Sequence, residues 1–415
     1  MAFAQRTEAA ASDRTALTGL QIGVAVLCGL IQMLDGYDLS AIGLAAPSLI
    51  HAWGVAPKDL TQAFVLSSVG IMVGALLSGP VADRFGRKPM LLFSVAMFGV
   101  FSLASAYAPS LHVLAVLRFF TGIGIGGAMP TTVALTSDYA TGRWRTSLVM
   151  FMFTGNTVGG VAAGQIAAEI LPNWGWQGIF MVGGVVPLVL LVALLFVLPE
   201  APQFQGGARP ASARANPVGG LFRDGLALST LMLWAIFLIN LLNMYLIGYW
   251  LPTVLHLNGL SPADAAFATS IYTAGAVLST LALGPLITRF GAERVLGLSL
   301  LIGSVFIGIL AMVPLSPMAT MAVLFVAGGG FIGSQLGLNG FAASVYPAAT
   351  RSTGIGWALG VGRLGGIAGP IVGGVLLGLG LPPTKIMLFA CGPGLITALL
   401  VVLLGRHRRS RLQDA

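Results

Sequence analysis

The sequence predicts an all-α polytopic membrane protein with twelve transmembrane helices in two pseudo-symmetric six-helix bundles. Its 415 residues are 56% hydrophobic and only 8% charged, with a mean hydropathy of +0.92, whereas soluble domains carry about 25% charged residues. Apolar runs recur along the whole chain, each long enough to cross a ~30 Å hydrocarbon core. The twelve runs cover approximately residues 18–47, 60–82, 89–108, 110–136, 146–171, 176–198, 226–254, 262–288, 293–313, 317–346, 352–379 and 384–405.

The distribution of basic residues predicts the orientation of these runs. If the runs alternate in direction, 17 of the 21 Lys and Arg fall on the side of the N-terminus and two, Lys58 and Lys385, on the other. The remaining two, Arg118 and Arg363, lie inside runs. Cytoplasmic loops are enriched in Lys and Arg, so both termini are expected in the cytoplasm. The net charge of +8 is therefore explained by the cytoplasmic loops and does not indicate a nucleic-acid partner.

The polar segments and an internal repeat predict the domain organisation. Segment 78–86 recurs at 283–291, an offset of 205 residues, and such repeats with a midplane site are typical of secondary transporters. The first run is too long for a signal peptide's apolar core, so we expect it to be an uncleaved span. The predicted parts are a cytoplasmic tail (1–17), an N-terminal bundle (18–199), a cytoplasmic linker (200–225), a C-terminal bundle (226–405) and a cytoplasmic tail (406–415).

Two carboxylates interrupt the first apolar run. Asp35 and Asp38, in the order Asp35-Gly36-Tyr37-Asp38, lie one helical turn apart on one face. An intramembrane carboxylate is costly unless it is protonated, paired or facing water. The pair therefore predicts a proton site or an ion pathway, and the alternative is a helix cap or a bridge between helices.

Two arginines occupy comparable depths in other runs. Arg118 lies roughly 12 Å from the outer end of its run, a depth similar to that of Asp38, which predicts an ion pair between them. Arg363 lies about 16 Å into the eleventh run, where its guanidinium is suited to bind an anion or a carboxylate of the first half. The other candidate substrate contacts, which could instead serve packing, are Tyr37, Asn240, Asn243, Tyr245, Gln335 and Asn339; the repeat places Asn240 and Asn243 over the two aspartates.

A charged loop between the second and third runs predicts a cytoplasmic gate. Glycines in segment 79–88 allow a sharp turn between two helices, and its charges can pair with neighbouring helix ends. An ordinary positive-inside turn would explain the basic residues but not their order. The predicted gate residues are Gly79, Asp83, Arg84, Gly86, Arg87, Lys88, Asp138, Glu200 and Arg351.

The sequence offers no motif for a primary energy source or for catalysis. None of the three lysines follows a glycine as a P-loop requires. No His/Cys metal cluster or Ser/His/Asp grouping stands out, and Cys28 and Cys391 lie in apolar runs without implying a disulfide. We therefore expect a protein that is not an enzyme, has no cofactor and uses a proton gradient.

Several segments resemble the major facilitator superfamily, and within it the aromatic acid:proton symporters. Segments 79–88 and 198–202 are similar to superfamily motifs, and segments 35–38, 118–130 and 351–363 to motifs of the symporter family. The resemblance implies import of a small aromatic carboxylate by alternating access, with the aspartates of the first span tied to proton coupling and Arg351 and Arg363 to anion transport. It also implies a bacterial inner-membrane location, and we expect a monomer.

Two other functions fit the same fold. A drug or metabolite:proton antiporter would carry a Gly-x-x-x-Gly-Pro-x-x-Gly-Gly pattern in the fifth span, but here the pattern lies at 365–374, in the eleventh. An intramembrane arginine in the second half also suits anions better than lipophilic cations. A non-transporting sensor would be expected to lose the Asp pair or to add a signalling domain. The sequence does not identify the acid that is carried.

Overall fold

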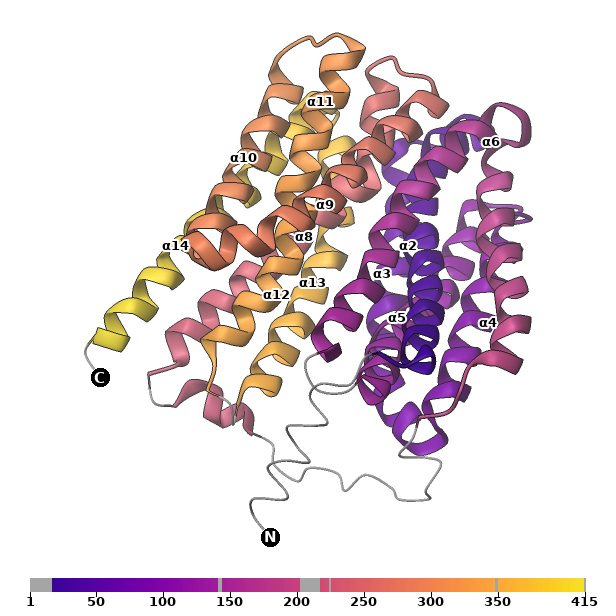
Figure 1. The fold of residues 1–415 in the computed structure, drawn as a ribbon. Helices are drawn as coiled ribbons and strands as arrows, with labels where there is room; N and C mark the ends of the chain where they lie inside the picture. The colour runs from indigo at the N-terminus through magenta and orange to yellow at the C-terminus, as the bar shows by residue number, and fades with distance from the viewer. Residues whose placement is uncertain (1–16, 141–143, 202–216, 224, 348–349, 414–415) are drawn as a thin grey trace. The chain divides into compact units, whose positions relative to one another are not determined.

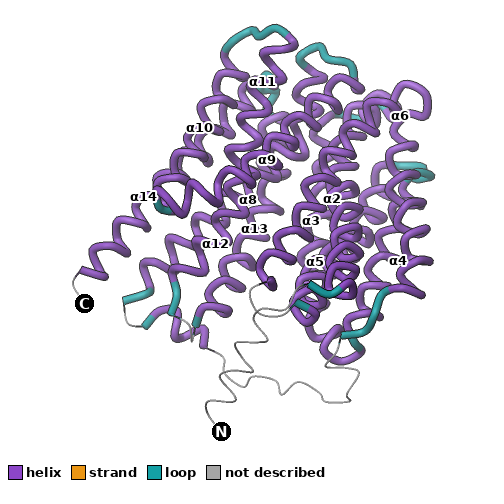
Figure 2. The backbone as a smooth tube through the Cα atoms, in the orientation of Figure 1, coloured by secondary structure: helices purple, strands orange, loops and turns teal. Residues whose placement is uncertain are grey.

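The computed structural model describes residues 17–140, 144–201, 217–223, 225–347 and 350–413, and in these ranges it consists of helices and short connections (Figures 1 and 2). The predicted tail 1–17 and the predicted linker 200–225 lie largely outside the described residues, as does the end of the C-terminal tail. Eleven of the described helices are long and apolar enough to cross a membrane.

The eleven candidates confirm the twelve predicted spans because one of them contains two. Helix α6 (Trp144–Val197) is 54 residues long, and Gly175 interrupts it with φ 59° and ψ −163°. A positive φ is readily adopted only by glycine, so the chain reverses here between the predicted fifth and sixth spans. The other helices of the first half are α2 (Gly19–Trp53), α3 (Thr61–Phe85), α4 (Arg87–Ser105) and α5 (Leu111–Tyr139), with a 3₁₀ turn η1 (Pro57–Leu60) before α3.

The second half continues with the same alternation of long helices and short turns. The predicted tenth span is not one regular helix: a π-helical turn, η3 (Gly329–Gly333), separates its two parts. The elements are η2 (Pro217–Phe222), α8 (Ala227–Leu257), α9 (Pro262–Phe290), α10 (Ala292–Met312), α11 (Pro317–Gly328), α12 (Ser334–Val345), α13 (Arg351–Gly378) and α14 (Pro383–Gln413).

Glycines determine how closely α2 and α6 pack. A Cβ atom at Gly36 would lie 1.9 Å from the Asn156 carbonyl oxygen, and one at Gly159 would lie 1.8 Å from that of Met33. Lipid offers helices no hydrophobic drive to associate, so small residues that let backbones touch provide the packing energy. The glycine inside the Asp35–Asp38 motif therefore has a structural role at the α2–α6 contact.

The second half uses the same device. A Cβ atom at Gly275 of α9 would lie 1.8 Å from the Phe325 carbonyl oxygen of α11. One at Gly365 of α13 would lie 2.0 Å from that of Leu238 in α8. The Gly365 contact lets α13 pack closely against α8, and so positions the side chains at that helix pair.

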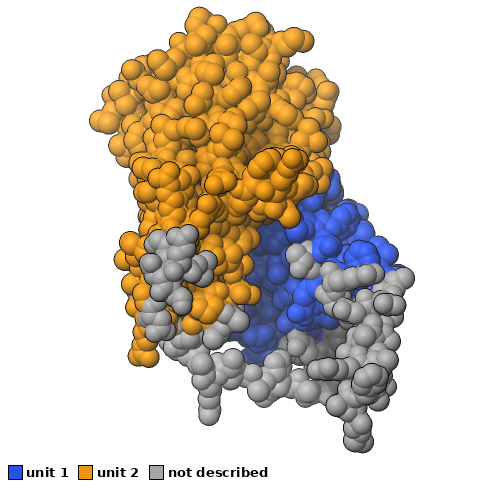
Figure 3. Space-filling model, turned by 60° about the vertical axis from the view of Figure 1, so that its left-hand side comes forward, with its two compact units in different colours: residues 1–39, 69–160, 180–212 blue, residues 40–68, 161–179, 213–415 orange. Residues whose placement is uncertain are grey.

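The chain separates into two compact units (Figure 3). One comprises residues 1–39, 69–160 and 180–212, and the other comprises 40–68, 161–179 and 213–415. Segments 40–68 and 161–179 thus group with the second half of the chain. The boundaries proposed for the two bundles stay a prediction.

Candidate functional site

The first polar site lies in the first unit, around Asp38 of α2. Arg118 of α5 donates from Nη1 to Asp38 Oδ2 at 3.1 Å, and both residues are 1% exposed. The ion pair predicted between the two runs is therefore present. Ser102 of α4 donates its hydroxyl hydrogen to the other carboxylate oxygen, Oδ1. Both oxygens of this buried carboxylate are thus hydrogen-bonded.

The guanidinium of Arg118 is held by uncharged groups as well. Its Nε donates to Ser105 Oγ at 3.2 Å and its Nη2 to Thr121 Oγ1 at 2.8 Å. The Phe180 ring of α6 lies 4.8 Å from the guanidinium carbon. A buried ion pair is tolerated only when additional hydrogen bonds compensate the lost hydration, and these contacts supply that compensation.

Asp35 and Tyr37 flank this site on the same helix. Asp35 is 1% exposed and Tyr37 is 4% exposed. The Tyr37 ring borders Gly183 of α6, where an added Cβ atom would lie 3.2 Å from Tyr37 Cε1. The structure buries both predicted carboxylates and places Asp38 on Arg118. Their role in proton coupling stays a prediction.

A second polar site lies in the other unit and consists of amides. Asn240 of α8 donates from Nδ2 to Gln335 Oε1 at 2.7 Å, and Gln335 donates from Nε2 to Asn339 Oδ1 at 3.3 Å. Gln335 and Asn339 lie on one face of α12, which begins immediately after the π turn. Asn243 is fully buried one turn from Asn240. These amides offer hydrogen-bond donors and acceptors to a polar group on a substrate.

Arg363 lies on α13, which packs against α8, the helix that carries Asn240 and Asn243. Its Nη1 donates to the Tyr245 hydroxyl at 3.4 Å, and the side chain is half-buried. A Cβ atom at Gly366 would lie 3.4 Å from the Tyr245 ring, so the backbone of α13 supports the ring directly. A guanidinium near the middle of a transmembrane helix can bind a carboxylate through two parallel hydrogen bonds.

A chain of aromatic contacts continues from Tyr245. Its ring meets that of Tyr249 at a centroid distance of 5.6 Å, and Tyr249 stacks on Phe64 of α3 at 4.8 Å with planes 7° apart. The ring of Trp250 packs edge-on against Phe64 at 5.0 Å and donates from Nε1 to the Pro370 carbonyl at 3.1 Å. These contacts join α3, α8 and α13 within the second unit.

The predicted gate includes a capped helix start. The Glu200 carboxylate accepts from the backbone nitrogens of Arg87 at 3.0 Å and Lys88 at 3.2 Å, at the beginning of α4. These amides have no intrahelical partner, and the helix dipole favours an anion there. Gly86 has φ 104°, and a Cβ atom on it would lie 2.6 Å from Glu200 Oε2. The loop glycine therefore leaves room for the capping carboxylate.

The remaining gate residues divide between this cluster and exposed positions. Arg87 forms an ion pair with Asp138 of α5, and Lys88 Nζ donates to the Leu195 carbonyl at 3.0 Å. Gly79, Asp83 and Arg84 lie at the exposed end of α3, and Arg351 is exposed at the start of α13, in the other unit. The loop residues that the sequence singled out are thus partly brought together, while their action as a gate stays a prediction.

Several functional neighbours were missed by the sequence analysis. Ser102, Ser105, Thr121 and Gly183 surround the Asp38–Arg118 pair. Ser102 and Ser105 are three residues apart in a largely apolar run, which is the same one-face spacing that identified the aspartates. The spacing of these two hydroxyls could therefore have identified them as neighbours of the ion pair.

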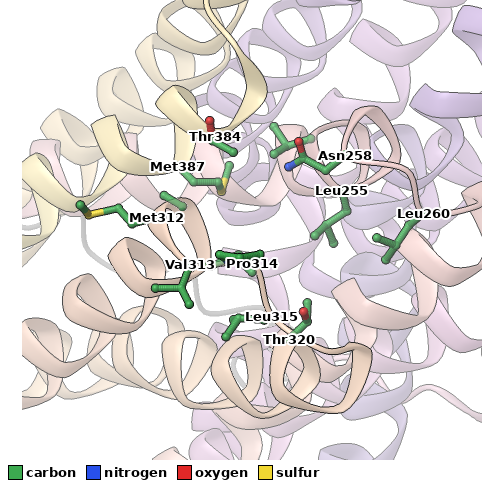
Figure 4. A pocket seen from close by; sticks show the side chains of 13 residues that line it. Leu255, Asn258, Leu260, Met312, Val313, Pro314, Leu315, Thr320, Thr384 and Met387 are labelled. Atoms are coloured by element: carbon green, nitrogen blue, oxygen red, sulfur yellow. The ribbon is translucent and has the colours of Figure 1, made fainter.

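A separate pocket of about 470 Å³ lies at one end of the second unit (Figure 4). Its wall combines the ends of α8 and α10, the turn before α11 and the beginning of α14. Asn258, Thr320 and Thr384 contribute its polar side chains. None of the predicted site residues lines this pocket, so it is distinct from the Arg363–Tyr245 contact.

Comparison with protein families finds one match over most of the chain. The family model described as Major Facilitator Superfamily matches residues 28–259 and 233–414. This match includes the Asp38–Arg118 pair, the amide site and Arg363.

Curated relatives match over nearly full length. A 3-(3-hydroxy-phenyl)propionate transporter of Escherichia coli is 38% identical over 410 residues, covering 98% of each chain. A 4-hydroxybenzoate transporter of Pseudomonas aeruginosa is 37% identical over 394 residues, covering 88% of each chain. A gallate transporter of Pseudomonas putida is 35% identical over 434 residues, covering 97% of this chain and 96% of the relative.

Solved structures agree on the fold. The nucleoside transporter NupG superposes with a TM-score of 0.74 at 14% identity, and the match covers 93% of this chain and 99% of NupG. A D-xylose-proton symporter superposes with a TM-score of 0.73 at 18% identity, and the match covers 92% of this chain and 97% of the symporter.

Proposed function

The chain belongs to the major facilitator superfamily, and from that premise we propose that it imports a small aromatic carboxylate together with protons by alternating access. It is a multi-pass membrane transporter and not an enzyme. Relatives at 35–38% identity carry 4-hydroxybenzoate, gallate or 3-(3-hydroxyphenyl)propionate, as their names state. Each of these substrates joins one carboxylate to a hydroxylated ring, which is the chemistry that a guanidinium and a set of amides can recognise.

The observation that carries the proposal is the position of Arg363. It lies near the middle of α13 and is held there by the Tyr245 hydroxyl at 3.4 Å. An intramembrane arginine is costly and usually marks a substrate or ion pathway. We assign the substrate carboxylate to this guanidinium and the substrate ring to the amides of Asn240, Asn243 and Gln335 with Asn339. Tyr37 and Arg118 stay candidate contacts in the first unit.

Proton coupling is assigned to Asp38, with Asp35 one turn away. While Asp38 is ionised it neutralises Arg118 at 3.1 Å. A proton on Asp38 would remove that attraction and leave Arg118 with Ser105 and Thr121. Loading of the proton and loading of the anion together leave the buried charge balanced, which would lower the cost of the conformational change.

The remaining assignments follow the charge distribution and the loops. We propose a bacterial inner-membrane location with both termini in the cytoplasm, a monomer, and the proton gradient as the energy source without a cofactor. The cluster of Glu200, Arg87 and Asp138 would act on the cytoplasmic side. Together with Asp83, Arg84 and Arg351, it would lock the outward-open state.

Uptake of labelled 4-hydroxybenzoate into proteoliposomes tests the proposal. Wild-type protein should accumulate the label only with an inward proton gradient, and Arg363→Ala should lose accumulation. Arg363→Lys should recover little, because an ammonium cannot reproduce the bidentate contact. Arg294→Ala is the matched control, since Arg294 is exposed at the start of α10. It should transport like the wild type.

The main competing function within this fold is proton-driven export. If no aromatic acid accumulates while the protein extrudes a lipophilic cation against its gradient, the import proposal is wrong. The arginine in α13 argues for an anion, and no observation in the described residues favours a cation site over it.

A further inference from the structure

The hydroxyl of Ser102 differs from the other hydroxyls around the ion pair. Ser105 donates its hydroxyl hydrogen to the Phe101 carbonyl at 2.7 Å, and Thr121 donates its own to the Leu117 carbonyl at 2.9 Å. Because a hydroxyl has a single hydrogen, these two oxygens can only accept from Arg118. They hold the guanidinium whatever the state of Asp38.

Ser102 instead gives its hydrogen to the carboxylate of Asp38. It is 0% exposed, so its hydroxyl has no access to bulk water. The behaviour of Ser105 shows that a serine in α4 can also donate to the carbonyl one turn earlier. For Ser102 that carbonyl belongs to Phe98, and a carbonyl oxygen can accept a second hydrogen bond beside its helical one.

We propose that Ser102 is a positioning residue for the proton site, with a hydroxyl that rotates between two arrangements. With Asp38 ionised, Ser102 donates to Oδ1. With Asp38 protonated, the carboxyl hydrogen is donated to Ser102 Oγ, and the Ser102 hydrogen turns to the Phe98 carbonyl. One proton enters, none is lost, and every polar atom stays paired in both states. This inference rests on the proposed role of Asp38 in proton coupling.

The tight surroundings of the Ser102 hydroxyl allow its hydrogen to rotate but leave the side chain no room to move. A Cβ atom at Gly183 of α6 would lie 2.9 Å from Ser102 Oγ and 3.0 Å from Asp38 Oδ1. The backbone of α6 therefore closes over the carboxylate and hydroxyl and leaves no volume for a larger side chain. A buried hydroxyl that served only one state would leave a polar group unpaired in the other, at a cost comparable to a lost hydrogen bond.

The groups that face Asp38 come from four helices. The charged one is Arg118 of α5, and Tyr37 is the titratable neighbour on α2 itself. Helix α4 contributes the Ser102 hydroxyl, and α6 contributes the Gly183 backbone. The Ser102 hydroxyl can both donate to the carboxylate and accept from the carboxyl, whereas the Arg118 guanidinium can only donate.

Two measurements on Ser102→Ala, Ser102→Thr and Asp38→Asn test the proposal. The first is pH-difference infrared spectroscopy of the purified protein, which detects the C=O stretch of a protonated carboxyl and needs no substrate. A band that is absent in Asp38→Asn should move to higher wavenumber in Ser102→Ala and return in Ser102→Thr. The second is the pH dependence of gradient-driven 4-hydroxybenzoate uptake in proteoliposomes.

In that assay Ser102→Ala should move the pH of half-maximal uptake upward by about one unit, because the ionised carboxylate loses a charge-assisted hydrogen bond. Substrate counterflow without a gradient should stay within about twofold. Ser94→Ala is the matched control, since Ser94 is equally buried on the same helix. Unchanged infrared band and pH midpoint in Ser102→Ala would overturn the inference, as would an unchanged band in Asp38→Asn. An infrared shift without any wild-type uptake would uphold Ser102 and reject the proposed substrate.

Discussion

The glycine between the two carboxylates of α2 gives the sharpest prediction. In Gly36→Ala, the new methyl carbon would start 1.9 Å from the Asn156 carbonyl oxygen, 2.7 Å from its carbon and 3.0 Å from its Cα. All three atoms are backbone of α6, so no side-chain rotation can relieve the overlap. The helices must separate by about 1 Å or more before the contact becomes tolerable.

The size of the effect follows from that displacement. Overpacking of a tight contact costs about 1–3 kcal/mol. Asp38 lies two residues from Gly36, so a shift of about 1 Å would stretch its 3.1 Å contact with Arg118 beyond hydrogen-bond reach. A hydrogen bond between charged groups contributes about 1.5–3 kcal/mol. We therefore expect the free energy of unfolding to fall by about 3–5 kcal/mol and uptake to fall on the order of 100-fold.

The assay is reversible unfolding of purified protein in mixed micelles by titration with SDS, paired with proteoliposome uptake. Gly23→Ala is the control on the same helix, because nothing lies within 4 Å of a Cβ atom there. It should be neutral or stabilise by up to about 1 kcal/mol through helix propensity. Gly159→Ala, on the α6 side of the same contact, should behave like Gly36→Ala. If Gly36→Ala unfolds within about 1 kcal/mol of the wild type and still transports, the glycine-packing argument fails.

Three further variants probe the other contacts. Gly86→Ala should destabilise by about 2 kcal/mol, because φ 104° strains any residue with a Cβ atom and the methyl group would displace the capping Glu200 carboxylate, and an unchanged SDS midpoint would contradict this. Tyr245→Phe should raise the KM for uptake several-fold at nearly constant maximal rate by freeing Arg363, and a fall in rate alone would contradict that positioning. Asn240→Ala should weaken substrate binding measured by calorimetry by about 1–2 kcal/mol, and unaltered affinity would remove the amides from the site.

The fold was predictable from the sequence because each span is identified by the hydropathy of its own residues, without knowledge of its neighbours. The twelve runs correspond to helices, including the pair hidden inside α6, and their ends agree with the prediction within about three residues, except that α2 continues to Trp53 and α14 to Gln413. The Asp38–Arg118 pair was also predictable, since equal depth in two spans is a one-dimensional property.

What could not be predicted depends on how helices are rotated and packed. Ser102, Gly183 and Phe180 meet the ion pair only because of the rotation of α4 and α6 about their axes, and apolar runs in lipid carry a weak rotational signal. The stacking of Phe64 on Tyr249 joins segments far apart in sequence. The break at Gly329–Gly333 in the tenth span had no pattern beyond its glycines.

That π turn gives the tenth span an evolutionary freedom. A π turn holds one residue more than an α turn, so it is equivalent to a one-residue insertion. Because the wider turn already absorbs its extra residue, deleting one of its glycines would restore a continuous α-helix and leave Gln335 and Asn339 in nearly the same rotational phase. The tenth span can therefore gain or lose one residue at this point without turning its amides away from Asn240.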